Sequence, residues 1–315
     1  MNYIIGIDLG GTFIKAGAVS KDGEILFETS LPSQAEVNPQ AVVRQIGKAV
    51  GIIEEKFQSD KLLGVGIGSP GMVDLDGGTV KNPPNLANWI VFRLGDEVVK
   101  LINEPVKVEN DANAAAVGEL KFGAGKGMKN FIMITLGTGV GGGIIADGKV
   151  FRGAEGGAGE IGHTTIDYNG PLCGCGNHGC IEAYVGQKHL SRHVAEQLKS
   201  HPESLINKLI KGDMEKLEPK IISDAANQGD PFALQIWKEA GFHVGIGLVS
   251  AMNVLDITTF IIGGGVAKAG KPLFDSIQET IVAHAFSTVK PRVRVLCAKL
   301  ENSAGVLGAA ALFAE

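Results

Sequence analysis

Short apolar runs separated by glycine-rich turns dominate the first part of the chain. These runs predict strands over 3–8, 14–19, 24–30 and 62–67. Residues 39–58 instead repeat apolar side chains at helical spacing and begin with a proline, which favours a helix. Strands and helices therefore alternate along the chain, and this order is typical of an α/β protein.

The rest of the chain continues the same alternation. Apolar runs predict strands over 106–109, 131–136, 143–146, 149–152, 257–262 and 292–298. Helical spacing predicts helices near 94–102, 112–121, 230–254 and 271–286, and a last helix from Ser303. The segment 82–89 predicts a loop, and 153–183 is irregular and rich in glycine and cysteine.

One pattern occurs twice. The order strand, glycine-rich turn, strand, Asp-Gly turn, strand runs through 4–27 and again through 131–152. We interpret this as an internal duplication that gives two α/β domains, each opening with a β-hairpin whose first turn is glycine-rich. A chance resemblance is the alternative, because Asp-Gly is a common hairpin turn. The predicted domains are 1–112, with the helix 303–315 packing back on it, and 113–302.

Composition limits the possible functions. The chain has 315 residues, of which 45 are glycine, about twice the usual share of ~7%. The net charge is −5 and no basic run occurs, so nucleic acid is not an expected partner. The N-terminus has no basic segment of a signal peptide, and no apolar stretch reaches the roughly 18–20 residues that span a membrane. These features predict a soluble cytoplasmic protein without a membrane partner.

The glycine-rich turns are candidate phosphate sites, because glycine lets backbone N–H groups approach an anion closely. The first turn offers Asp8, Gly10, Gly11, Thr12 and Lys15, and the second offers Gly137, Thr138 and Gly139. Asp8 could hold Mg²⁺ through water. Gly264 and Gly265 follow a buried strand and could lie beside an adenine. Ordinary turns are the alternative at each place. Neither a P-loop nor a convincing Rossmann pattern occurs.

Two further groups carry chemistry. Asp111 follows a strand and starts a helix, where it is either a general base or a plain N-cap. His163, Cys173, Cys175 and Cys180 supply the four ligands of a closed, structural zinc site. His178 could replace His163 as the fourth ligand. Reduced cysteines without metal and a disulfide are the two interpretations that compete with zinc.

Several motifs in one order resemble the ROK family of repressors and sugar kinases, within the actin-like ATPase superfamily. They are DLGGT at 8–12, ENDANAAA at 109–116, LGTGVGGG at 136–143, GEIGH at 159–163, CGCGNHGCIEAY at 173–184 and IIGGG at 261–265. The resemblance covers essentially the whole chain and is strongest to the bacterial ATP-dependent glucokinases of the family. It implies two actin-like (ribonuclease H-like) domains that flank a cleft.

The resemblance also implies roles for individual residues. Asp111 would be the catalytic base for phosphorylation of a hexose 6-hydroxyl. The sugar hydroxyls would be bound by Asn85, Asn110, Asp111, Glu160, His163 and Glu182. His163 would bind zinc with one ring nitrogen and sugar with the other, so the zinc would shape the sugar loop without taking part in the chemistry. ATP, Mg²⁺ and structural Zn²⁺ are the implied ligands, and a homodimer or higher homo-oligomer is the expected assembly.

More than one function is compatible with this resemblance. The hexose could be N-acetylmannosamine, N-acetylglucosamine, fructose or allose instead of glucose, and polyphosphate could replace ATP. Repressors of the family carry a DNA-binding domain before the first hairpin. Because the first strand begins near residue 3, we expect an enzyme and not a repressor. An inactive sugar-binding protein is a further interpretation of the same motifs.

Overall fold

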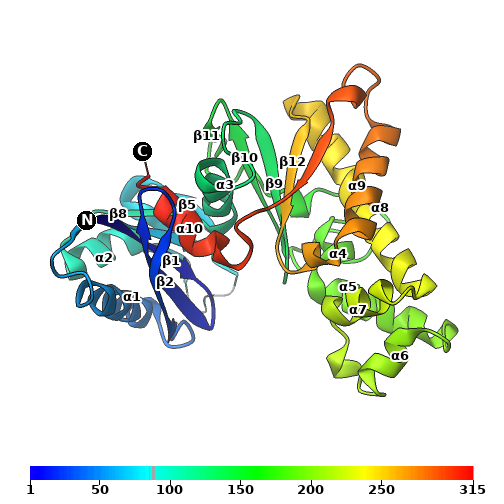
Figure 1. Cartoon of the computed structure of the whole chain (residues 1–315), viewed down its shortest axis with the longest axis horizontal. Coiled ribbons are helices and arrows are strands. Elements are labelled where there is room, and N and C mark those ends of the chain that lie inside the picture. The colour runs from blue at the N-terminus through cyan, green and yellow to red at the C-terminus, as the bar shows by residue number, and fades with distance from the viewer. Residues whose placement is uncertain (85, 87–88, 315) are drawn as a thin grey trace. The chain divides into compact units, whose positions relative to one another are not determined.

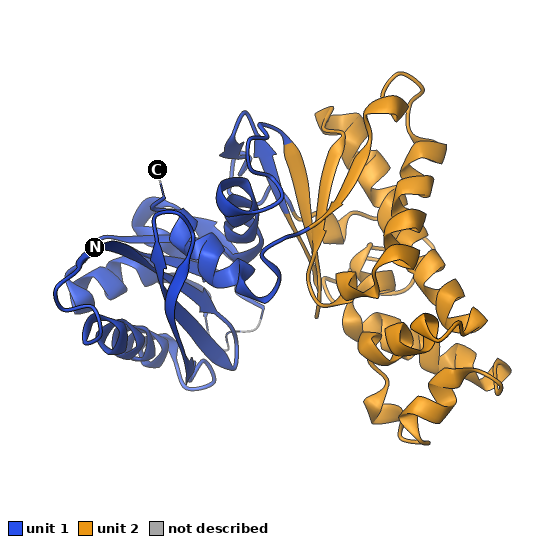
Figure 2. Ribbon diagram, viewed as in Figure 1, with its two compact units in different colours: residues 1–130, 143–159, 298–315 blue, residues 131–142, 160–297 orange. Residues whose placement is uncertain are grey.

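The chain is described here by a computed structural model that covers residues 1–84, 86 and 89–314 (Figure 1). Asn85, one of the predicted sugar-binding residues, therefore lies outside the described residues. The structure divides into two compact units (Figure 2). Unit 1 contains residues 1–130, 143–159 and 298–315, and unit 2 contains residues 131–142 and 160–297. The predicted domain boundary near residue 112 stays a prediction.

Unit 1 is built on a five-stranded sheet. Its strands are β1 (Asn2–Leu9), β2 (Phe13–Ser20), β3 (Ile25–Pro32), β4 (Lys61–Ser69) and β8 (Val106–Asn110). Their order is β3-β2-β1-β4-β8. The first three strands pair antiparallel, whereas β4 and β8 extend the sheet in parallel with β1. The parallel half therefore presents the carboxyl ends of β1, β4 and β8 along one edge.

Four α-helices accompany this sheet. They are α1 (Pro39–Glu54), α2 (Leu94–Ile102), α3 (Asp111–Phe122) and α10 (Ala304–Ala311). The last helix, α10, packs directly on β1 and β4. A Cβ on Gly6 would lie 2.0 Å from the backbone oxygen of Val306, and one on Gly66 would lie 1.9 Å from that of Ala309. Only glycine allows this close approach between helix and strand.

A second sheet repeats the strand order of the first. Its strands are β9 (Phe131–Leu136), β10 (Val140–Ala146), β11 (Lys149–Val150), β12 (Thr259–Gly263) and β13 (Arg294–Cys297). The order β11-β10-β9-β12-β13 matches that of the first sheet, with the hairpin strands on one side and parallel strands on the other. This correspondence supports the predicted duplication.

Unit 2 contains β9, β12, β13 and the first residues of β10, and it is otherwise mainly helical. Its α-helices are α4 (Glu182–Val185), α5 (Gln187–Gln197), α6 (Leu205–Ile210), α7 (Pro219–Asn227), α8 (Pro231–Leu255) and α9 (Lys271–His284). Within the described residues, no helix is both long enough and apolar enough to cross a membrane.

Several sequence predictions need correction. The first helix ends at Glu54 and not near 58. The second glycine-rich turn is shorter than predicted, because β10 already begins at Val140 and includes the glycines that follow it. Three short strands were not predicted: β5 (Met72–Asp74), β6 (Thr79–Lys81) and β7 (Val91–Arg93). They form a sheet of their own, and three residues are too few for a period-2 pattern to be recognised.

Candidate active site and metal centre

The carboxyl edge of the first sheet gathers several predicted site residues. In the parallel register, Asp8 on β1 and Glu109 on β8 both pair with Gly68 on the strand between them. The backbones of Asp8 and Glu109 are thus two strand spacings apart, about 10 Å. The first glycine-rich turn follows Asp8, and Asp111 follows two residues after Glu109. Ligands of parallel sheets bind at such an edge.

The first turn has a fixed backbone. The Gly10 N–H donates to the Phe13 carbonyl at 3.0 Å, and a Cβ on Gly10 would lie only 2.9 Å from the same oxygen. The Ser33 hydroxyl donates to the Gly11 carbonyl at 2.8 Å. Thr12 at the tip is exposed. These hydrogen bonds therefore fix the backbone of the turn, while Thr12 at its tip faces solvent, as a phosphate-binding turn requires.

Asp8 lies in a less polar environment than an exposed carboxylate. Burial raises the pKa of its carboxyl, and Lys15, its partner across the β1–β2 pair, opposes this rise. The N-terminal end of α10 crowds the same carboxyl, since a Cβ on Gly305 would lie 2.4 Å from it. A carboxylate that is costly to ionise gains most from a nearby cation, so Asp8 fits the predicted role toward Mg²⁺.

The start of α3 shows which residue is its N-cap, while the role of Asp111 as general base stays a prediction. The side-chain oxygen of Asn110 accepts the N–H groups of Ala112 and Asn113 at 3.0 and 3.1 Å, so Asn110 is the N-cap. Its amide nitrogen also donates to the Gly71 carbonyl at 3.0 Å. Asp111 occupies the first helical position and is exposed. The capping role thus belongs to Asn110, a role that the sequence did not reveal.

The second sheet gathers a further set of glycines in the same way. Gly263 at the end of β12 pairs with Thr135 near the end of β9. Gly264 has a φ of +90°, and a Cβ there would lie 2.2 Å from the Leu136 carbonyl. Thr138, Gly264 and Gly265 are exposed. The second turn and the predicted adenine-side glycines are therefore neighbours, as a nucleotide that extends from phosphate to base requires.

Glu182, at the start of α4, contacts the second turn. One of its carboxylate oxygens accepts the Val140 N–H at 2.9 Å. A Cβ on Gly139 would lie 2.4 Å from that oxygen, so the turn needs glycine there. The sequence separates Glu182 from Val140 by 42 residues, and no motif linked them. The predicted sugar contact of Glu182 stays a prediction. Glu160 is exposed at the start of the 3-10 helix Ile161–His163.

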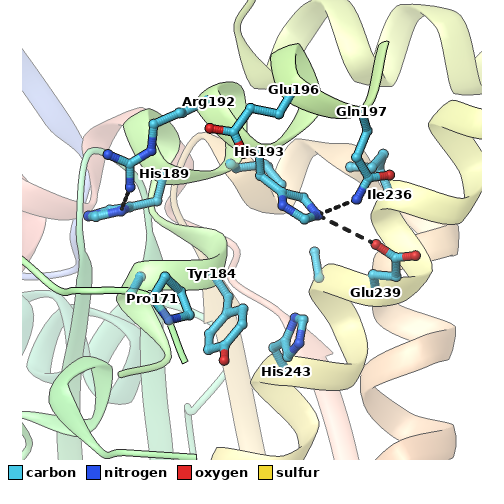
Figure 3. A pocket seen from close by; sticks show the side chains of 13 residues that line it. Pro171, Tyr184, His189, Arg192, His193, Glu196, Gln197, Ile236, Glu239 and His243 are labelled. Atoms are coloured by element: carbon cyan, nitrogen blue, oxygen red, sulfur yellow. Dashed lines mark hydrogen bonds and ion pairs between the residues drawn. The ribbon is translucent and has the colours of Figure 1, made fainter. Parts of the chain in front are cut away.

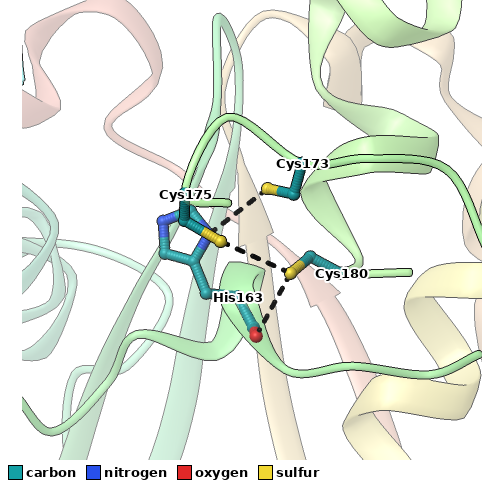
Figure 4. Close-up of side chains that lie close together, drawn as sticks. All are labelled: His163, Cys173, Cys175 and Cys180. Atoms are coloured by element: carbon teal, nitrogen blue, oxygen red, sulfur yellow. Dashed lines mark hydrogen bonds between the residues drawn. The ribbon is translucent and has the colours of Figure 1, made fainter. Parts of the chain in front are cut away.

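The four predicted zinc ligands come together in unit 2 (Figure 4). The ligand atoms of His163, Cys173, Cys175 and Cys180 all lie within 4.8 Å of one another. The Sγ atoms of Cys175 and Cys180 are 3.7 Å apart, and Cys173 Sγ lies 3.7 Å from His163 Nδ1. Tetrahedral zinc with bonds of roughly 2.3 Å to sulfur and 2.0 Å to nitrogen predicts separations of about 3.5–3.8 Å. The residues therefore fit a structural zinc site in which His163 Nδ1 faces the metal.

Glycines allow the loop to wrap around these ligands. Gly176 has a φ of +94° and Gly179 a φ of +66°. A Cβ on Gly179 would lie 1.6 Å from the Asp167 carbonyl. His178, the competing candidate for fourth ligand, is exposed, and its Nδ1 lies 3.0 Å from the Gly170 carbonyl oxygen. The structure therefore groups the three cysteines with His163.

A separate cavity of about 380 Å³ is lined by α4, α5 and α8 (Figure 3). Tyr184 and His243 stack there with ring centroids 4.0 Å apart, and burial lowers the pKa of His243. His193 lies 3.8 Å from the Glu239 carboxylate. The lining contains none of the described residues that were predicted to bind sugar, nucleotide or metal.

The predicted site residues thus form two groups. Unit 1 carries Asp8, Gly10, Gly11, Thr12, Lys15, Asn110 and Asp111. Unit 2 carries Gly137, Thr138, Gly139, Glu160, His163, Glu182, Gly264, Gly265 and the three cysteines. Two sheets of the same order, each with a glycine-rich turn at its carboxyl edge, are the architecture of an actin-like ATPase fold.

Comparison with known proteins defines the family. The model of the ROK family matches residues 4–315, and the chain belongs to this family. It is 37% identical to a glucokinase of Thermotoga maritima, over 99% of this chain and 97% of that protein. It is also similar to the crystal structure of a ROK family glucokinase from Streptomyces griseus in complex with glucose and AMPPNP. That likeness has 39% identity, a TM-score of 0.84 and 98% coverage of each chain.

Repressors are also among the relatives. The chain is 32% identical to a xylose repressor of Caldicellulosiruptor bescii, over 98% of this chain but 77% of the repressor. The glucokinases therefore match this chain over nearly their whole length, whereas the repressor has a further portion that the match does not cover.

Proposed function

We propose that this chain is an ATP-dependent hexose kinase that converts glucose to glucose 6-phosphate. The proposal is supported by full-length similarity to glucokinases, one of which was crystallised with glucose and an ATP analogue. The observation that carries it in this chain is the carboxyl edge of the first sheet. There an exposed carboxylate, Asp111, follows β8, and a glycine-rich turn with Asp8 beside it follows β1, and both of these strands pair in parallel with β4.

In the proposed reaction, Asp111 accepts the proton of the glucose 6-hydroxyl. The 6-oxygen attacks the γ-phosphorus of ATP, and the bond from that phosphorus to the bridging oxygen breaks, so that ADP leaves with the electron pair. Phosphoryl transfer depends mainly on positioning and charge stabilisation. The two turns would hold the phosphates, and Gly264 and Gly265 would border the adenine. Mg²⁺ near Asp8 would neutralise phosphate charge.

The sugar would be held by contacts to its hydroxyl groups. The residues proposed for these contacts are Asn85, Asn110, Glu160, His163 and Glu182. Because Nδ1 of His163 faces the cysteines, Nε2 is the nitrogen left for a sugar hydroxyl. Zinc would stabilise the loop that presents His163. Its closed set of four protein ligands leaves no position for substrate, which is typical of a structural site.

A panel of sugars assayed with ATP tests the substrate. We expect release of ADP that depends on sugar and is fastest with glucose, measured by a coupled assay. Faster phosphorylation of N-acetylmannosamine, N-acetylglucosamine, fructose or allose would make that sugar, and not glucose, the preferred substrate. Turnover with polyphosphate in place of ATP would show that polyphosphate serves as a phosphate donor. Sugar binding without ADP release from any sugar would favour a binding or regulatory protein, as in the repressor relatives.

We further propose that the enzyme acts in the cytoplasm as a homodimer or higher homo-oligomer. This part of the proposal rests on the resemblance to the ROK kinases. Light scattering coupled to size-exclusion chromatography measures the assembly directly. A mass of one chain, 32.9 kDa, across the concentrations used in the kinase assay would contradict it.

A further inference from the structure

A buried carboxylate lies two residues before the proposed catalytic base in the chain. Glu109, at the end of β8, has a side chain that is only 2% exposed. One of its oxygens accepts two hydrogen bonds from Arg152, from Nε at 2.9 Å and from Nη2 at 2.5 Å. The second oxygen accepts the backbone N–H of Asn110 at 3.1 Å and the side-chain amide of Asn113 at 3.2 Å. Four donors therefore fix this one carboxylate.

Such a pair is unusual among the ion pairs of the described residues. The rest join exposed or half-exposed side chains, as Arg93 does with Asp76 and Asp96. Exposed pairs contribute little to stability, whereas the burial of a carboxylate is costly unless a charged partner and hydrogen bonds compensate for the lost water. Arg152, which is 31% exposed, supplies both through its planar guanidinium.

The two residues of this pair also make hydrogen bonds to two segments that precede predicted site residues. Glu109 holds the N–H of Asn110, and Asn110 is the N-cap that sets where α3 and Asp111 begin. Arg152 also accepts the Ala158 N–H at its carbonyl, at 3.0 Å, and so closes the segment 153–158. That segment ends two residues before Glu160. All of these contacts lie within unit 1.

We propose that Arg152 and Glu109 are positioning residues for phosphoryl transfer. Their contact, in which two N–H groups of Arg152 bond one oxygen of Glu109, fixes the peptide that precedes Asp111, so that the Asp111 carboxylate is oriented toward the attacking hydroxyl. The inference rests on the proposed function and goes beyond it, because neither residue belongs to the predicted site. A loss of this contact should therefore lower kcat much more than it weakens nucleotide binding.

Arg152→Lys tests this geometry, because lysine keeps the positive charge but lacks the planar guanidinium that directs two N–H groups to one oxygen of Glu109. We expect kcat to fall about 10- to 100-fold, since a displacement of about 1 Å in a reacting group can cost that much. The KM for ATP should stay within about twofold of the parent value. Arg152→Met should lower kcat at least as far. Arg93→Met removes an exposed arginine pair in the same unit and is the matched control, with an unchanged kcat.

Folding is monitored for every variant by circular dichroism and thermal melting, and the kinetics are measured well below the melting temperature. If Arg152→Met fails to fold, the double variant Glu109→Gln, Arg152→Met removes the unpaired buried charge and takes its place. We expect the double variant to fold and to keep the low kcat, because the contact between the two side chains is still missing.

The outcomes separate the two proposals. No sugar phosphorylation by the parent protein would overturn the proposed function itself. A parent enzyme that phosphorylates sugar, together with a folded Arg152→Lys variant of equal kcat, would overturn the positioning role alone. That role would also be overturned if Arg152→Lys raised the KM for ATP while leaving kcat unchanged. If kcat decreases only in proportion to the folded fraction of the variant, the Arg152–Glu109 pair has a purely structural role.

Discussion

Replacing Asp111 by asparagine removes the proposed base while preserving the local structure. Asp111 is exposed at the first position of α3, and one of its oxygens accepts the Ala112 N–H at 2.8 Å. The asparagine side chain has the same shape and retains an oxygen that can accept this hydrogen bond. The N-cap is provided by Asn110 and does not change. The substitution therefore changes the charge and the proton affinity of one exposed side chain.

These facts set the size of the two expected effects. A carboxylate general base contributes roughly 10²- to 10⁴-fold to the rate, so kcat should fall at least about 100-fold. A fall of that size corresponds to about 2.7 kcal/mol of transition-state stabilisation. The stability effect is much smaller, because the loss of one negative charge at an exposed helix N-terminus costs about 0.3–1 kcal/mol. Activity should therefore be lost from a protein that remains folded.

A coupled ADP-release assay measures kcat, and titration calorimetry measures the binding of glucose to the same preparation. We expect glucose binding within a few-fold of the parent protein, because Asp111→Asn keeps a polar group beside the 6-hydroxyl. Turnover by the variant above one tenth of the parent value would refute the role of Asp111 as base. Loss of both glucose binding and the folded state would instead place Asp111 in the structural framework.

Two further predictions concern the metal and Asp8. Elemental analysis should find about one zinc per chain. Cys180→Ser should lower the zinc content, and it should also lower the melting temperature by at least about 5 °C, because a structural zinc contributes several kcal/mol and 1 kcal/mol corresponds to about 2–4 °C. Zinc-free parent protein with the full melting temperature would contradict the site. Because burial raises the pKa of Asp8 in the folded state, ionising it costs stability as the pH rises above its unfolded pKa of about 3.9. Asp8→Asn should therefore melt above the parent protein near pH 7.5, with a smaller difference near pH 4.5, and a variant that melts below the parent at pH 7.5 would be inconsistent with that cost.

Local patterns in the sequence were enough for much of the fold. The strands 3–8 and 131–136 and the helix 112–121 agree with the structure within one or two residues, because their periodicity and their flanking turns are local properties. The zinc ligands could be predicted for the same reason, since three of the four fall within eight residues. The three-residue strands β5, β6 and β7 could not be predicted, because pairing with each other, and not local pattern, makes them strands.

The sequence by itself therefore determined the kinds of groups that this protein can use. It supplied the glycine-rich turns, the carboxylate at Asp111 and the set of soft metal ligands, each of which has a chemistry that depends on residue type and short spacing. Only the tertiary structure decided which groups meet. Glu109 lies 43 residues from Arg152, and Glu182 lies 42 residues from Val140. Such contacts follow from the register of parallel strands and the packing of helices, which no short stretch of sequence specifies.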